Sequence, residues 1–162
     1  MSNAIDVVYL LVFIFALALV LTIVLLVLDQ FATNPLVTST FTSEQLQPIA
    51  YAQTALMYLD YLIVFVVALY FVAALVTAYY VKTHPVFYVA MLITQIIIIA
   101  ISAFISNLWA SIASNPVLLP ITNSFVFLPL VLGYLPIITL ILSSAIAVIS
   151  YGNPSNPYEA NQ

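Results

Sequence analysis

The stretch Ile5–Leu28, IDVVYLLVFIFALALVLTIVLLVL, decides the fold class of this chain. Its 24 residues contain no glycine or proline, and their one charge, Asp6, stands next to the start. At a rise of about 1.5 Å per residue, a helix of this length spans roughly 36 Å, more than the bilayer hydrocarbon core of about 30 Å. The stretch therefore predicts a membrane-spanning helix bracketed by Asp6 and Asp29.

The composition of the whole chain indicates the same surroundings. Hydrophobic residues make up 66% of the 162 residues and charged residues 4%, and the mean hydropathy is +1.28. A soluble globule needs more polar side chains than this to cover its surface. We therefore expect a membrane protein whose first partner is the lipid bilayer.

Three further segments have the length of membrane spans. Tyr51–Val81 holds one charge, Asp60, and Val86–Trp109 and Phe125–Ser150 follow it. We predict an all-α integral membrane protein, a bundle of helical hairpins with four transmembrane helices at about 5–28, 55–81, 86–109 and 125–150.

The remaining segments are short and polar. Residues 1–152 form a single membrane domain in this interpretation, and 153–162 form an extended polar tail. The longest connector, 29–50, is too short for a soluble domain. We expect it to be an irregular exposed loop, after which Ser43–Gln47 start a short interfacial turn that leads into the second span. The first span lacks a basic segment before it and is long for a signal peptide, so we expect it to be retained.

The short segment KTHP, Lys82–Pro85, holds the only lysine and the only histidine of a chain without arginine. The positive-inside rule places this loop, and with it both termini, on the inner side of the membrane. The same residues suit a local turn: Lys82 faces the negative end of one helix, Thr83 or His84 caps the next, and Pro85 occupies its first turn. We favour this turn over a catalytic role for His84.

The residue inventory excludes several kinds of site. A chain without cysteine has no disulfide framework and no iron–sulfur ligation, and one histidine cannot supply a bis-histidine haem. The net charge of −4 and the pI near 4.1 argue against a nucleic-acid-binding surface. We expect no catalytic residue, no cofactor, no metal and no nucleic-acid partner.

Two polar residues within the spans raise the question of transport. Gln95 lies about 15 Å beyond Pro85, where it either lines a pathway or, as we favour, hydrogen-bonds to a neighbouring helix. An intramembrane carboxylate such as Asp60 suggests proton or ion handling. However, Asp60 lies roughly 31 Å from the Lys82 end of its helix, and we expect it to be solvated at the opposite interface.

Small or polar residues four positions apart predict close packing between helices. The pairs are Ser102 with Ser106, Ala103 with Asn107, and Ser143 with Ala147. Together with Gln95, these residues are the candidate helix-packing positions.

The fourth span carries Pro129, Gly133 and Pro136. Interrupted helices build binding sites in many transporters, but we favour a kinked packing helix here because the feature occurs once in the chain. Alternatively, Pro129 lies at the start of the helix and only Pro136 produces a kink.

The order of several segments carries a resemblance. After the first span and a Thr-, Ser- and Asn-containing connector, the chain reads LDYLIVF (59–65), KTHPVFY (82–88), ISNLW (105–109), GYLPIITLIL (133–142) and VISYG (148–152). Over residues 1–152 this pattern resembles small multi-span membrane proteins of lipid-containing viruses of archaea and bacteria. The coat proteins of spindle-shaped archaeal viruses are similar in style over the first two helices but have two spans instead of four. The resemblance implies a virion component in a membrane, with no catalytic residues to carry over.

Three classes of function follow from these observations. We favour a non-enzymatic structural protein, a virion component that is embedded in or organises a viral membrane and associates with other membrane or coat proteins as a homo- or hetero-oligomer. The alternative is an accessory subunit of a cellular membrane complex, such as a respiratory one. A small transporter or channel is the third class, and it requires Asp60 or Gln95 to face a water-filled path.

Overall fold

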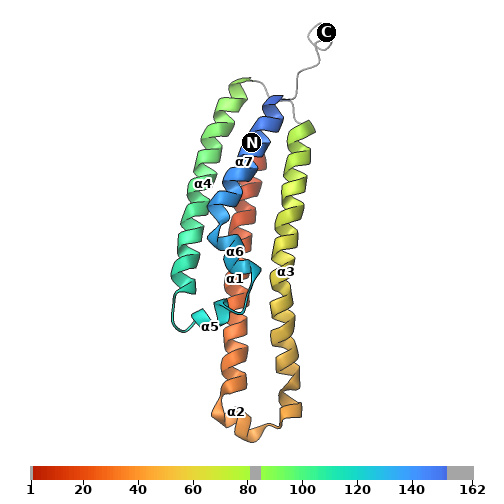
Figure 1. Cartoon of the computed structure of the whole chain (residues 1–162), viewed down its shortest axis with the longest axis vertical. Helices are drawn as coiled ribbons and strands as arrows, with labels where there is room; N and C mark the ends of the chain where they lie inside the picture. The colour runs from red at the N-terminus through yellow and green to blue at the C-terminus, as the bar shows by residue number, and fades with distance from the viewer. Residues whose placement is uncertain (1, 81–84, 153–162) are drawn as a thin grey trace.

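The computed structural model describes residues 2–80 and 85–152, which form helices joined by short turns, with no strand among them (Figure 1). The elements are α1 (Ser2–Thr33), α2 (Pro35–Thr40), α3 (Ser43–Tyr80), α4 (Pro85–Ala113), α5 (Leu119–Thr122), α6 (Phe127–Gly133) and α7 (Leu135–Gly152). The all-α prediction is confirmed. Lys82, Thr83, His84 and the predicted tail 153–162 lie outside the described residues, whereas Pro85 begins α4 as expected.

The prediction of an irregular loop over 29–50 is wrong, because this segment is almost entirely helical. α1 ends at Thr33, and the Asn34 side chain caps α2 by accepting the Leu36 N–H at 3.0 Å. At the start of α3, the Gln45 side chain accepts the Thr42 N–H at 3.0 Å, as in one half of a capping box. Local caps thus divide the connector into helices.

α3 begins at Ser43, whereas the expected beginning was near residue 55. This early start makes it the longest of the described helices, with 38 residues. At about 1.5 Å per residue it is roughly 57 Å long, nearly twice the thickness of a hydrocarbon core. In Figure 1, α2 and the adjoining ends of α1 and α3 reach beyond α5. At this end of the molecule, the ends of α1 and α3 that α2 joins therefore project beyond the rest of the bundle.

The four long helices form a bundle whose spatial order differs from the order in the chain. Each packs against two others, in the sequence α1, α3, α7, α4 around the bundle. α7 lies between α3 and α4, so these two successive helices make little contact with each other (Figure 1). α1 thus packs against α3, and α4 packs against α7, whereas α3 and α4 do not form a packed pair.

The core is a seam of side chains at heptad spacing. On α1 the buried positions are Leu11, Ile14, Ala18, Leu21 and Leu25, which alternate by three and four residues. They pack together with Ile98, Ile105 and Trp109 of α4 and with Phe125, Leu128 and Leu132 near α6. Spacing of this kind keeps one face of each helix toward its neighbours.

Three helices among the described residues, α1, α3 and α4, are long and apolar enough to cross a membrane. The pair α6 and α7 makes a fourth candidate span if it is counted as one, although its two parts are bent by 64°. The predicted spans are therefore present as helices, and the fourth is interrupted.

Candidate functional site

The side chain of Asp60 connects α3 to the beginning of α6. Its Oδ2 accepts the N–H groups of Val126 at 2.7 Å and Phe127 at 2.8 Å, and its Oδ1 accepts the Leu128 N–H at 2.6 Å. Only 1% of the residue is exposed. A single carboxylate thus caps a helix that begins 67 residues further along the chain.

Pro129 completes this cap. The first four amide positions of a helix have no carbonyl partner within it. In α6 three of them, from the N-cap residue Val126 onward, bond to Asp60, and the fourth is Pro129, which has no N–H. The α6 start therefore has no unsatisfied donor, and the charge lies at the positive end of the helix dipole.

The expected solvation of Asp60 at an interface is wrong. Its carboxylate is buried within the protein and hydrogen-bonded to backbone amides rather than exposed. The partner segment cannot be identified from the sequence, because it contributes only backbone N–H groups. A carboxylate in an apolar helix was the one available signal that a distant partner exists.

Three hydrogen bonds connect α4 to the broken span. Gln95 Nε2 donates to the Ser143 carbonyl at 3.0 Å, the Ser102 and Thr139 hydroxyls lie 2.9 Å apart, and Ser106 Oγ donates to the Gly133 carbonyl at 3.0 Å. We call these contacts the α4–α7 polar ladder. Gln95 makes the bond to a neighbouring helix that was favoured over a pathway.

The ladder follows the geometry of the two helices. Gln95, Ser102 and Ser106 are separated by seven and four residues, so they share one face of α4. Ser102 is fully buried, and when its hydroxyl donates to the Ile99 carbonyl at 2.8 Å it accepts from Thr139. Polar groups at this interface therefore have partners, as groups removed from water require.

The other candidate packing residues divide into two groups. Ser143 and Ala147 are buried on α7, and Ala103 is half-buried on α4. Asn107 is exposed on α4, so it does not contribute to packing within the chain. Thr139 belongs to the ladder but was missed, although it stands four positions before Ser143 and therefore has the same spacing as the pairs that were singled out.

The break between α6 and α7 lies at Tyr134, where the backbone has φ −98° and ψ 12°. Pro129 lies in the first turn of α6 and Pro136 in the first turn of α7, positions where a proline interrupts nothing. The part of the alternative that places Pro129 at the start of its helix is therefore confirmed, whereas the expected kink at Pro136 is a break at Tyr134, two residues earlier. The Ser106 hydroxyl binds the Gly133 carbonyl at the break.

A surface pocket of about 240 Å³ lies beside Asp60. The residues that line it include Thr54, Met57, Tyr58, Asp60, Tyr61 and Ser124. The Tyr61 ring packs edge-on against Phe127 at 5.1 Å and lies 6.4 Å from the Tyr58 ring. This pocket combines a carboxylate, two hydroxyl side chains and aromatic rings.

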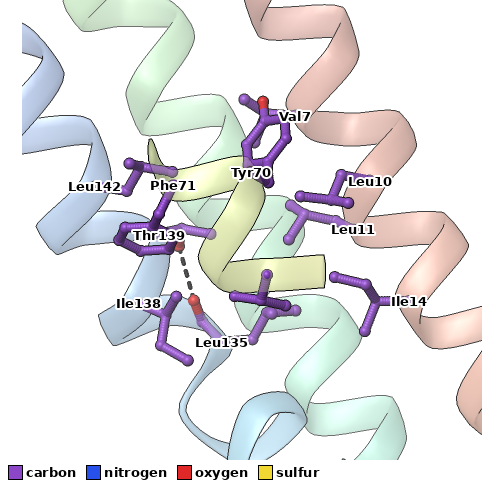
Figure 2. Close-up of a pocket in the computed structure, with 11 residues that line it drawn as sticks. Val7, Leu10, Leu11, Ile14, Tyr70, Phe71, Leu135, Ile138, Thr139 and Leu142 are labelled. Atoms are coloured by element: carbon purple, nitrogen blue, oxygen red, sulfur yellow. Dashed lines mark hydrogen bonds between the residues drawn. The ribbon is translucent and has the colours of Figure 1, made fainter. Parts of the chain in front are cut away.

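A second, much smaller gap of about 20 Å³ lies between α1, α3 and α7 (Figure 2). Its lining consists of apolar side chains together with Tyr70 and Thr139, and the Thr139 hydroxyl bonds to the Leu135 carbonyl at 2.9 Å. A buried water needs two to four polar partners, which this gap does not offer. We interpret it as a packing gap.

Across the described residues, no group of three or more His, Cys, Asp or Glu side chains is placed to hold a metal ion. Comparison with protein-family models, with curated proteins and with solved structures finds no match for this chain. The arrangement of the polar residues is thus the basis on which a function can be argued.

Proposed function

We propose that this chain is a non-enzymatic structural protein of a membrane, with α1, α3, α4 and the α6–α7 pair as its four spans. The single observation that carries the proposal is the use made of its polar side chains. Asp60, Gln95, Ser102 and Ser106 each bond to another helix of the same chain. Groups committed to packing hold helices together rather than bind a transported solute.

The surface of the bundle supports a membrane location. α3 buries Asp60, Ile63 and Ala78 and exposes large apolar residues along its outer side, among them Phe65, Leu69 and Val72. An apolar surface of this extent is stable when lipid or another apolar protein covers it. The chain offers both kinds of contact over its full length.

We further propose that the membrane is that of a virion and that the partners are other membrane or coat proteins. The resemblance in segment order over 1–152 supports this, together with a composition that contains one lysine and no arginine. Cellular membrane proteins use several basic residues to set their orientation. A protein positioned by dense packing against its neighbours does not need them.

Extraction of the protein in mild detergent, followed by identification of everything that comigrates at native size, tests the proposal. We expect abundant coat proteins and lipid to comigrate with it. Comigration with haem or quinone enzymes would instead indicate an accessory subunit of a respiratory complex. Solute flux through reconstituted liposomes that disappears in Asp60→Asn or Gln95→Leu, with folding retained, would indicate a transporter.

A further inference from the structure

The pocket beside Asp60 has an excess of negative charge. The described residues include no lysine or arginine, and the only lysine of the chain, Lys82, follows the far end of α3. The 20 residues after Asp60 in α3 extend over about 30 Å. Coulomb attraction across such a distance is weak, so no side-chain cation of the described residues neutralises the carboxylate.

The hydrogen bonds of Asp60 compensate its charge only in part. A helix N-terminus carries about half of a positive elementary charge, which leaves roughly half of the carboxylate charge unbalanced. A carboxylate has about four lone-pair positions, and the three amides of α6 occupy three of them. The pocket therefore retains a negative potential and one acceptor position.

The aromatic side chains add attraction for a cation. Tyr58 and Tyr61 line the pocket and are 67% and 56% exposed, so their rings are accessible from outside the bundle. Their centroids lie 6.4 Å apart, which allows one cation to lie within about 6 Å of both rings. Tyrosine faces with a nearby carboxylate are the groups that recognise organic ammonium ions.

The two hydroxyl groups complete the lining. Thr54 Oγ1 donates to the Ala50 carbonyl and Ser124 Oγ donates to the Ile121 carbonyl, so both oxygens keep lone pairs for accepting. A metal ion would need several more oxygen ligands around it than one carboxylate position and two hydroxyls. A pocket of about 240 Å³ is instead large enough for a substituted ammonium group.

We propose that this pocket binds an organic ammonium group, carried by an aminolipid headgroup or by a free alkylammonium ion. The lipid source rests on the proposed membrane location. There, Asp60 stands at the end of a 20-residue apolar segment, 61–80, whose length of about 30 Å matches the hydrocarbon core. The binding of a free ammonium ion does not depend on that location.

Choline is the probe for the test, and 3,3-dimethylbutan-1-ol, which has a carbon in place of the nitrogen, is its neutral control. The full chain is purified in an uncharged detergent, and saturation transfer from protein to the probe methyl groups is measured by NMR. We expect choline to bind at least about tenfold more tightly than the neutral alcohol. Equal binding of the two probes would overturn the proposal.

Tyrosine variants locate the bound probe without removing the cap of α6. Tyr58→Leu and Tyr61→Leu should each weaken choline binding by about fivefold or more. Tyr9→Leu is the matched control, because Tyr9 is 70% exposed on α1 and should leave binding unchanged. Binding that is unaffected by both pocket variants, or displaced by sodium at equal concentration, would refute the ammonium site.

Vesicles then distinguish the two sources of the ammonium group. The protein is reconstituted in phosphatidylglycerol with or without phosphatidylcholine of the same acyl chains, and choline binding is measured again. Competition by phosphatidylcholine supports a lipid headgroup as the occupant, whereas unchanged choline binding supports a free ion. Absence of choline binding already in detergent would overturn the site while leaving the proposed structural role intact.

Discussion

At the scale of single residues, Asp60 accepts three hydrogen bonds from backbone N–H groups of a distant segment. Hydrogen bonds from N–H groups to a carboxylate are about twice as strong as those between neutral groups. Asp60 receives three of them, from Val126, Phe127 and Leu128, and only 1% of the residue is exposed. Loss of this acceptor would leave buried donors unsatisfied, which costs more than the bonds contribute in net terms.

The variant Asp60→Asn should therefore destabilise the fold by about 1 to 3 kcal/mol, because an amide group offers one oxygen in place of two. The measurement is unfolding in mixed micelles with increasing SDS, followed by the fluorescence of Trp109. This residue is the only tryptophan of the chain and is 2% exposed.

Asp29→Asn is the matched control, since it removes the same charge from the end of α1. Asp29 is only partly buried there, and we expect its substitution to change the free energy of unfolding by less than about 0.5 kcal/mol. A similar small change for Asp60→Asn would show that the carboxylate does not hold the start of α6.

At the scale of elements, α4 and α7 are held by polar contacts within an apolar interface. Apolar side chains pack against lipid as well as against protein, so they choose a helix partner weakly. Hydrogen bonds select the partner helix through their geometry. The α4–α7 polar ladder has three of them along one face of α4. The ladder therefore sets the register between the two helices.

Gln95→Leu should reduce the free energy of unfolding by about 0.6 to 2 kcal/mol, the range found for hydrogen bonds between helices in membranes. Asn107→Leu removes an amide from the exposed side of the same helix and should change the free energy of unfolding little. The SDS titration measures both. An equal loss for the two variants would contradict the assignment of Gln95 to the interface.

The break between α6 and α7 does not depend on the glycine at position 133. Gly133 has no positive φ, and a Cβ atom added to it would meet nothing within 4 Å. Gly133→Ala should therefore be neutral or stabilise the protein by up to about 1 kcal/mol.

Ala100→Gly, on the exposed side of the unbroken α4, should instead lower the free energy of unfolding by about 1 kcal/mol. The same titration measures both variants. A marked loss for Gly133→Ala would instead show that the break depends on the glycine.

At the scale of the whole molecule, the bundle places α2 and the Tyr80 end of α3 far apart along its length. Within α3 alone, 38 residues separate the two ends by about 57 Å. If the chain spans a membrane as we propose, α2 lies on one side and Lys82 on the other. The positive-inside rule predicts that Lys82 lies inside.

A chain without cysteine permits a direct test with single-cysteine variants. In intact cells, a membrane-impermeant maleimide should label Ser39→Cys on α2, and Thr83→Cys only after permeabilisation. Val72→Cys is the control for burial in lipid, because Val72 is 60% exposed in the chain but should remain unlabelled until denaturation. Rapid labelling of Val72→Cys in membranes would contradict the membrane location.

The same positions show how far sequence analysis reaches. The three long apolar helices could be predicted because length and composition are local properties, and the helical bond pattern satisfies each backbone group within the segment. The heptad seam of α1 could not be predicted, because α1 is apolar on all sides and its sequence shows no periodic alternation of apolar and polar residues. The helix α2 in the connector was missed because its cap, Asn34, was interpreted as a loop residue.

The sequence by itself thus determined the helical class, the approximate spans and the candidates for polar packing such as Gln95 and Ser102. Only the tertiary structure decided that α7 lies between α3 and α4, and that Asp60 is buried at the start of α6. The physical reason is that span formation depends on each segment alone. The partner of a buried carboxylate depends on backbone amides that have no signature in the sequence.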